Sequence, residues 1–113
     1  FAPCAMGSVL NDDTVGRLKA KVVAGAANNQ LAEDRHGDAL AERGIVYLPD
    51  YVANGGGLIC CEAEWYRLDR DAVTDKVKGI RRTCVEILEA AADQGVATNV
   101  ASDRLAEQRF RGG

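Results

Sequence analysis

The sequence lacks the features by which several large classes of protein are recognised. It has one histidine, His36, and none of its four cysteines forms a C-x-x-C pair, so the ligand spacing of a zinc or redox site is missing. No run of glycines matches the G-x-G-x-x-G fingerprint of dinucleotide-binding loops. No apolar stretch approaches the roughly 20 residues that a membrane helix requires. We therefore expect no bound metal and no membrane association.

An excess of basic residues is missing as well. The chain has 14 Lys and Arg residues against 17 Asp and Glu residues, which gives a net charge of −3. Nucleic acids and anionic membranes attract clustered Lys and Arg residues that displace counterions. We therefore expect no nucleic-acid partner, and we expect a cytoplasmic protein. Reduced thiols with structural roles suit that compartment, and this is our interpretation of Cys4, Cys60, Cys61 and Cys84.

The length of 113 residues leaves room for one domain with a modest core, or for part of a domain. The chain begins with Phe1 instead of Met, and residues 1–5 resemble the end of a strand. We therefore expect a piece of a longer protein. A sheet that has lost its neighbouring strands exposes an unpaired edge, so we also expect this piece to associate with itself or with another chain.

Strands and helices alternate in the first half of the chain. Residues 11–14 supply typical helix-cap side chains, Gly44 is a typical helix stop, and short apolar runs lie between helical segments. The predicted elements are a strand in residues 1–5, a helix to residue 18, a strand at 21–24, a helix at 35–43 with Leu40 facing inward, and a strand at 45–48. This order predicts an α/β fold with a parallel sheet and right-handed crossovers.

The second half is predicted to be helical. A helix follows the glycines at 55–57, with an inward apolar stripe formed by Leu58, Cys61, Trp65 and Leu68. A long helix is predicted from the cap Asp69 to Gln94, with Gly95 as its stop and an apolar stripe typical of a core-facing helix. A last helix is predicted at 100–109, with Ala101 and Leu105 on one side, and residues 111–113 are expected to fray.

The run at 24–31 is the strongest candidate for a binding site. It follows Val22 and Val23, which suit a strand buried on both faces. Small residues at 25–27 leave the carboxyl end of this strand open, and ligands of open α/β sheets bind at that end. Asn28 and Asn29 then offer amides that both donate and accept hydrogen bonds. The alternative is an ordinary turn with a helix cap. Glycines 55–57 permit a similar close approach by a ligand, or form a flexible turn.

Four ordered segments carry a resemblance to a known family. The segments APCAMGSVLNDDTV, LKAKVVAGAANNQL, RHGDALAERGIVYLPDYVANGGG and ASDRLAEQRF resemble the leucine, valine and phenylalanine dehydrogenase family. The resemblance implies the second half of a Rossmann-type domain, with strand and helix repeats in 1–52 and helices in 53–113 that return toward a substrate domain. Enzymes of this family oxidatively deaminate an L-amino acid to a 2-oxo acid and ammonia while reducing NAD, and they also run the reverse reaction.

The resemblance also implies roles for individual residues. Asn28 is similar to the asparagine that lies at the nicotinamide and helps to hold the substrate carboxylate. The implied cofactor contacts are Cys4, Ala5, Gly25, Ala26, Ala27, Asn28 and Asn54. Leu58 and Cys61 stand where the family places its side-chain pocket, usually as two valines, so the resemblance leaves the preferred amino acid open. The family's catalytic lysine and aspartate belong to the substrate domain, so no catalytic residue is expected in this chain.

Two functions from different classes follow. In the first, the chain is a fragment of an NAD-dependent dehydrogenase for branched-chain or other apolar L-amino acids; the parent enzyme is a homo-oligomer, and the fragment alone is inactive. In the second, the chain is a non-catalytic nucleotide-binding or interaction module that keeps the same fold.

Overall fold

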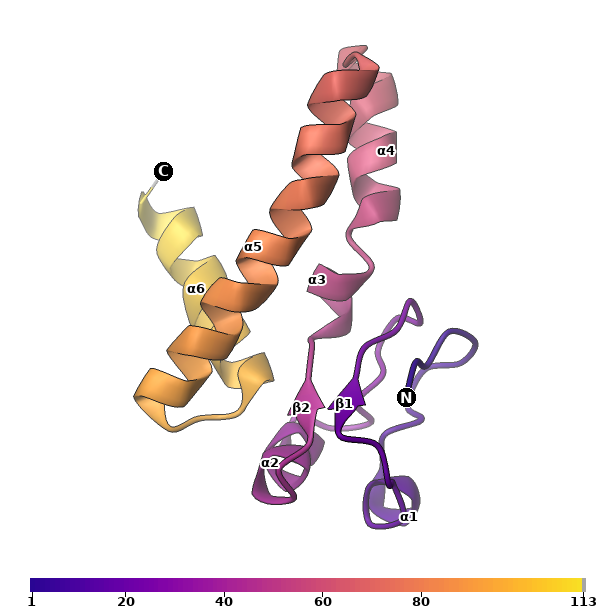
Figure 1. Cartoon of the computed structure of the whole chain (residues 1–113), viewed down its shortest axis with the longest axis vertical. Coiled ribbons are helices and arrows are strands. Elements are labelled where there is room, and N and C mark those ends of the chain that lie inside the picture. Colours follow the sequence, from indigo (N-terminus) through magenta and orange to yellow (C-terminus); the bar gives the residue numbers. More distant parts are fainter. Residues whose placement is uncertain (113) are drawn as a thin grey trace.

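Two short parallel strands organise the amino-terminal half of the chain (Figure 1). The computed structural model describes residues 1–112. Strand β1 comprises Val22–Val23 and strand β2 comprises Val46–Tyr47, and Val22 is paired with Val46. Each strand is shorter than the predicted run of four residues. The predicted parallel pairing is confirmed.

The strand predicted in residues 1–5 is not formed. The ammonium group of Phe1 donates a hydrogen bond to the carbonyl of Val22, and the amide of Ala24 donates to the carbonyl of Phe1. The segment therefore starts alongside β1. Pro3 has no N–H group to donate, so the pairing does not continue as a ladder, and the sheet has two strands where the sequence predicts three.

Two helices cover one face of this sheet. Helix α1, Asp12–Val15, begins with a capping box in which the Asn11 side chain accepts hydrogen bonds from the amides of Asp13 and Thr14. It ends before the predicted residue 18, because the chain continues as tight turns after Val15. Helix α2, Arg35–Glu42, has nearly the predicted bounds, and Gly44 follows it with a φ of +66°.

The first hydrophobic core lies between these helices and the sheet, and it consists of Leu10, Val15, Val23, Leu40, Ile45 and Tyr47. Successive side chains of a strand point to opposite faces. Val23 is therefore fully buried, whereas Val22 is 46% exposed. The prediction that this strand is buried on both faces is wrong for residues 1–112, in which only one face of the sheet is covered.

Helices form the rest of the chain. They are α3 (Asp50–Ala53), α4 (Gly56–Tyr66), α5 (Arg70–Gln94) and α6 (Thr98–Gly112). The α4–α5 hairpin projects away from the sheet, and α6 returns beside the carboxyl-terminal part of α5 (Figure 1). The predicted bounds of α5 are confirmed, with Asp69 as its cap and Gly95 in the left-handed conformation. None of these helices in residues 1–112 combines the length and the apolarity that crossing a bilayer needs.

The second core lies between α5 and α6. Ile87 and Ala91 of α5 pack there against Ala101 of α6, and Leu105 borders the cluster, as predicted. Helix α6 is longer than predicted at both ends. Arg111 and Gly112 are helical and not frayed, and Gly113 lies outside the described residues.

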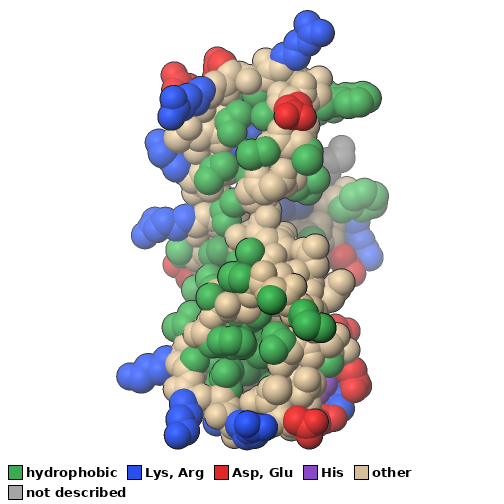
Figure 2. All heavy atoms as spheres, turned by 90° about the vertical axis from the view of Figure 1, so that its right-hand side faces the viewer, with side chains coloured by type: hydrophobic (Ala, Val, Ile, Leu, Met, Phe, Trp, Pro, Cys, Tyr) green, Lys and Arg blue, Asp and Glu red, His purple; other side chains and the backbone are tan. Residues whose placement is uncertain are grey.

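The inward stripe predicted for α4 is wrong. Leu58 is 77% exposed and Trp65 is 82% exposed. Cys61 is also exposed, and only Leu68, beyond the helix, is half-buried. Spacing indicates that one face of a helix is apolar, but it does not say what covers that face. Figure 2 shows hydrophobic side chains gathered over the α4–α5 hairpin and again over the amino-terminal half of the chain.

The four cysteines are free thiols. Cys4, Cys60 and Cys61 are exposed, so they do not pack in a core of residues 1–112 as the predicted structural role requires. Cys84 in α5 is half-buried, and burial raises the pKa of its thiol.

Candidate functional site

The turn after β1 is closed around a buried glutamine. Gln30 is fully buried, and its Nε2 donates hydrogen bonds of 2.9 Å to the carbonyls of Gly25 and Ala27. A Cβ atom at Gly25 would lie 2.1 Å from the carbonyl oxygen of Pro3. The small residues at 25–27 therefore do permit a close approach, but the neighbour at Gly25 is the backbone of this chain. Gln30 is not among the predicted site residues, because a glutamine in a polar turn gives no sign of burial.

The structure brings two predicted site residues together. The Nδ2 atom of Asn54 donates a hydrogen bond of 2.6 Å to Oδ1 of Asn28, and it lies 3.4 Å from the carbonyl oxygen of Ala26. Asn28 follows β1, and Asn54 follows β2 and the single turn of α3. The pair therefore lies at the carboxyl ends of the two strands. Within residues 1–112 this is the one hydrogen bond of the Asn28 side chain, so its Nδ2 is free to donate.

An open groove of about 730 Å³ lies beside this pair, lined by Ala26, Asn28, Tyr51, Ala53, Asn54, Gly55, Gly56, Gly57, Leu58, Val77 and Ile80. Helix α4 begins in the groove without a side-chain cap, and the first N–H groups of any α-helix lack intrahelical acceptors. Cβ atoms at Gly56 and Gly57 would meet nothing within 4 Å. The groove thus combines amide groups, a helix amino terminus and an apolar wall.

Five predicted site residues do not line this groove. Cys4 and Ala5 are exposed and lie close to the turn, because the amide of Ala27 donates to the carbonyl of Pro3 just before them. The other three are Gly25, Ala27 and Cys61. Gly25 and Ala27 hold the turn through their backbone carbonyls. Cys61 lies on α4 after Leu58 and outside the groove lining.

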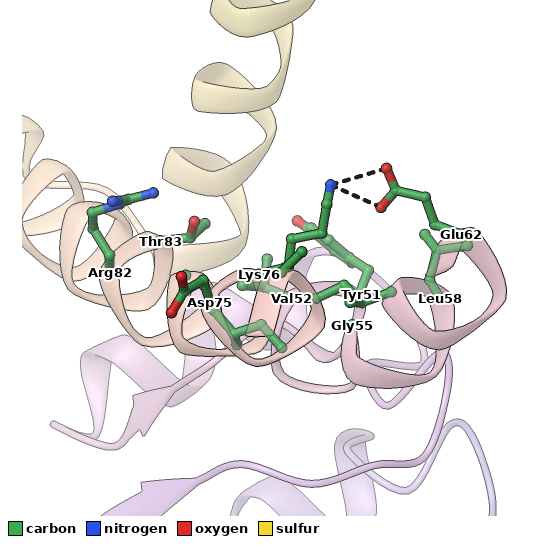
Figure 3. A pocket seen from close by; sticks show the side chains of 13 residues that line it. Tyr51, Val52, Gly55, Leu58, Glu62, Asp75, Lys76, Arg82 and Thr83 are labelled. Carbon is green, nitrogen blue, oxygen red and sulfur yellow. Dashed lines mark hydrogen bonds and ion pairs between the residues drawn. The ribbon is translucent and has the colours of Figure 1, made fainter. Parts of the chain in front are cut away.

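A second hollow, of about 650 Å³, lies between α3, α4 and α5, and its lining shares Tyr51, Gly55, Leu58 and Ile80 with the groove. Lys76 of α5 points toward Glu62 of α4 and bonds both of its carboxylate oxygens, at 2.9 and 3.1 Å (Figure 3). Both side chains are about 40% exposed, 43% for Lys76 and 39% for Glu62. An ion pair of this kind contributes only about 0–1 kcal/mol. We assign this hollow no ligand.

One histidine and two carboxylates lie close enough to hold a cation. Ligand atoms of Asp12, Glu33 and His36 lie within 4.8 Å of one another. Arg35 already binds both oxygens of Asp12 at 2.7 Å and both oxygens of Glu33 at 3.0 Å. The hydrogen bonds from Arg35 lower the pKa of Asp12 to about 2. The cluster is therefore an ion-pair link between the start of α1 and the start of α2, and it gives no sign of a metal centre.

The family model described as glutamate/leucine/phenylalanine/valine dehydrogenase matches residues 1–110. The chain belongs to this family. The leucine dehydrogenase of Bacillus cereus is 52% identical to this chain over 110 residues. The match covers 97% of this chain and 30% of that relative. The phenylalanine dehydrogenase of Caldalkalibacillus thermarum is 44% identical over 98% of this chain and 30% of the relative. The chain thus spans about a third of the length of these relatives, and the family resemblance of the sequence is confirmed.

A solved structure of the family agrees with this fold. The L-tryptophan dehydrogenase of Nostoc punctiforme superposes with a TM-score of 0.94 and 47% sequence identity, covering 99% of this chain and 34% of that protein. The chain is therefore an α/β segment of an amino acid dehydrogenase fold, with a small parallel sheet and flanking helices.

Proposed function

We propose that this chain supplies the nicotinamide side of the cofactor cleft in an NAD-dependent L-amino acid dehydrogenase. The reaction is the oxidative deamination of an apolar amino acid, of the branched-chain or a similar class, to its 2-oxo acid and ammonia. The observation that carries the proposal is the Asn28–Asn54 pair at the carboxyl ends of two parallel strands, in a chain that belongs to this family. Open α/β sheets bind their ligands at that edge.

The proposal keeps the organisation that the sequence predicts. Residues 1–52 and 53–113 form the second half of a Rossmann-type domain and its returning helices, while the substrate domain and the glycine-rich half lie outside this chain. The parent enzyme is proposed to be a cytoplasmic homo-oligomer that acts on a small-molecule amino acid. The 113-residue chain by itself is expected to be inactive, because the family's catalytic lysine and aspartate lie elsewhere.

The groove has the donors that a nicotinamide and an amino acid carboxylate require. Asn28 offers a free Nδ2 donor, and the uncapped start of α4 favours negative charge. Gly56 and Gly57 leave the backbone open to a ligand. NAD, when bound, supplies the acceptor for the hydride of the substrate. The residues of this chain fit such a group, and their contribution is orientation.

The individual roles follow from position. We propose that Asn28 donates a hydrogen bond to the substrate carboxylate. We propose that Asn54 holds the Asn28 amide in place and also contacts the cofactor. The small side chain of Ala26 leaves space in the groove for a ligand, and Leu58 forms an apolar edge that we propose contacts the substrate side chain. Of the other predicted cofactor contacts, Cys4 and Ala5 lie beside the turn and Gly25 and Ala27 lie within it. We propose that these four residues act through the backbone. The predicted contact of Cys61 with the substrate stays a prediction.

A chimaeric enzyme tests the proposal. The matching segment of the Bacillus cereus leucine dehydrogenase, 52% identical to this chain, is replaced by residues 1–110, and NADH formation is followed with a panel of apolar L-amino acids. We expect turnover, and we expect Asn28→Ala to lower kcat/KM by about 10²-fold, which is the cost of a misplaced reactant. A folded chimaera that binds NADH without turnover would favour the non-catalytic module. A folded chimaera with neither property would refute the proposed function and the nucleotide-binding form of the alternative module.

A further inference from the structure

The turn that carries Asn28 is held from a second side by a buried carboxylate. Asp50, the first residue of α3, is 8% exposed. Its Oδ2 accepts a hydrogen bond of 2.9 Å from the backbone amide of Asn29. Its Oδ1 accepts a hydrogen bond of 2.9 Å from the hydroxyl of Tyr47. Both oxygens are therefore used inside the protein, and neither lines the groove.

Helix α3 joins this carboxylate to the asparagine pair. Asp50 stands at its start and Asn54 just beyond its end, and the amide of Asn54 donates a hydrogen bond of 2.8 Å to the carbonyl of Asp50. Asp50 holds the backbone of the turn at Asn29, while Asn54 holds the side chain of Asn28. The single turn of α3 therefore holds this part of the chain at two points, the backbone amide of Asn29 and the side chain of Asn28.

The backbone at Asn29 needs such support. Its φ is +53°, in the left-handed region that side chains adopt rarely. Its carbonyl accepts a hydrogen bond of 2.6 Å from the amide of Ser8, and its amide donates to Asp50. Burial, together with the hydrogen bond to Asp50, raises the pKa of Tyr47 further above neutral pH, and its phenol donates to Asp50. Without Asp50 the amide of Asn29 and the Tyr47 hydroxyl both lose this partner.

We propose that Asp50 is a positioning residue: through the amide of Asn29 its carboxylate fixes the direction in which the Asn28 side chain offers its free donor to the groove. Asp50 does not touch the ligand itself. The identity of that ligand rests on the proposed function, whereas the hold of Asp50 on the turn does not. A displacement of about 1 Å at a reacting group can cost on the order of 10²-fold in rate, so a residue that only orients Asn28 can have a large effect.

The test compares three variants in the chimaeric enzyme. Asp50→Ala removes both acceptor atoms, and Asp50→Asn keeps an acceptor for the amide of Asn29 in a side chain of the same shape. Asp69→Ala is the matched control: Asp69 also accepts a backbone amide, that of Ala72 at 2.8 Å, but it caps α5 at the far end of the hairpin (Figure 1). Thermal unfolding is measured for each variant to establish that it is folded.

Two readouts decide the question. The first is steady-state kinetics, in which we expect Asp50→Ala to lower kcat/KM for the amino acid by about 10²-fold, Asp50→Asn to restore most of it, and Asp69→Ala to leave it unchanged. The second is hydrogen–deuterium exchange of the peptide around Asn29. We expect its protection to be lost in Asp50→Ala, kept in Asp50→Asn and kept in Asp69→Ala.

The outcomes separate this inference from the proposed function. Unchanged exchange at Asn29 in folded Asp50→Ala would overturn the role of Asp50, whatever the activity. So would an active chimaera in which Asp50→Ala keeps its kcat/KM within about 2-fold, since orientation effects are expected to be far larger. An inactive parent chimaera would defeat the proposed function alone, because the exchange experiment would still decide how the turn is held.

Discussion

The replacement of Gln30 by glutamate is the sharpest test of how the turn after β1 is built. The two side chains have nearly the same size and shape, but Gln30→Glu replaces the Nε2 donor with an oxygen. That donor serves the carbonyls of Gly25 and Ala27, each at 2.9 Å, from a side chain that is fully buried. The variant therefore changes two attractive contacts into contacts between acceptors, and it adds a buried charge.

The expected loss follows from these two carbonyls. A buried acceptor left without its partner costs about 1–3 kcal/mol, so two of them suggest a loss of about 2–6 kcal/mol in the free energy of unfolding at neutral pH, before the burial of the charge is added. Protonation returns one donor to the variant. Burial raises the pKa of such a carboxyl above its unfolded value. The destabilisation is therefore complete above the folded pKa and declines as the pH falls through it.

The measurement is urea denaturation of this chain at neutral and at mildly acidic pH, followed by circular dichroism. Gln30→Leu serves as the control: it removes the donor together with the Oε1 atom, which has no hydrogen-bond partner among the described residues. The same two carbonyls lose their donor in this control, but the unpartnered Oε1 is removed as well, so we expect a loss at the low end of about 2–6 kcal/mol, with no dependence on pH. Equal urea midpoints for Gln30→Glu and the parent at neutral pH would show that the side chain is not a buried donor.

Three further predictions address the fold. Leu40→Ala empties a fully buried position in the first core and should lower the free energy of unfolding by about 2–5 kcal/mol, measured by urea denaturation; a loss below about 1 kcal/mol would contradict the core assignment. Gly25→Ala places a Cβ atom 2.1 Å from the carbonyl oxygen of Pro3, so thermal melting should show clear destabilisation, and a neutral result would mean that residues 1–5 are not docked on the turn. The pKa of Asp12 is lowered from 3.8 to about 2 by Arg35, so its contribution is present above the unfolded pKa and is lost as the pH falls toward 2; an acid titration of Asp12→Asn should lack this loss, and identical acid limbs for variant and parent would refute the pairing.

Much of the fold follows from short-range chemistry that the sequence displays. Asp69 and Gly95 cap α5 where predicted, and α1 is capped by Asn11, one of the predicted cap residues at 11–14. A cap is made by bonds to the backbone within three or four residues, so it is visible in the local sequence. The regular apolar stripe of α5 predicts a helix of the observed length, because the spacing of three and four residues is also a local pattern. The two apolar runs at 21–24 and 45–48 predict parallel strands, since a helix lies between them, and strands form at 22–23 and 46–47 within these runs.

The exposure of the helices could not be obtained in this way. Leu58 and Trp65 have the spacing of a buried stripe, yet both are mostly exposed, because burial depends on a second surface that the spacing does not specify. The same is true of Val22 on the uncovered face of the sheet. A periodic pattern identifies the apolar side of an element. Whether another element covers that side is decided by the whole fold.

The candidate site divides along the same line. The sequence by itself determined that residues 25–29, which follow the first strand, are small residues and then two amides. The family resemblance singled out Asn28 and Asn54. Only the tertiary structure decided that these two amides meet, that Gln30 closes the turn from inside and that Asp50 holds it from α3. For the Asn28–Asn54 and Asn29–Asp50 contacts the reason is distance along the chain, because hydrogen bonds between residues more than 20 positions apart form only after the two strands have paired. Gln30 bonds residues three and five positions away, but its burial depends on the packing around the turn, which no local pattern records.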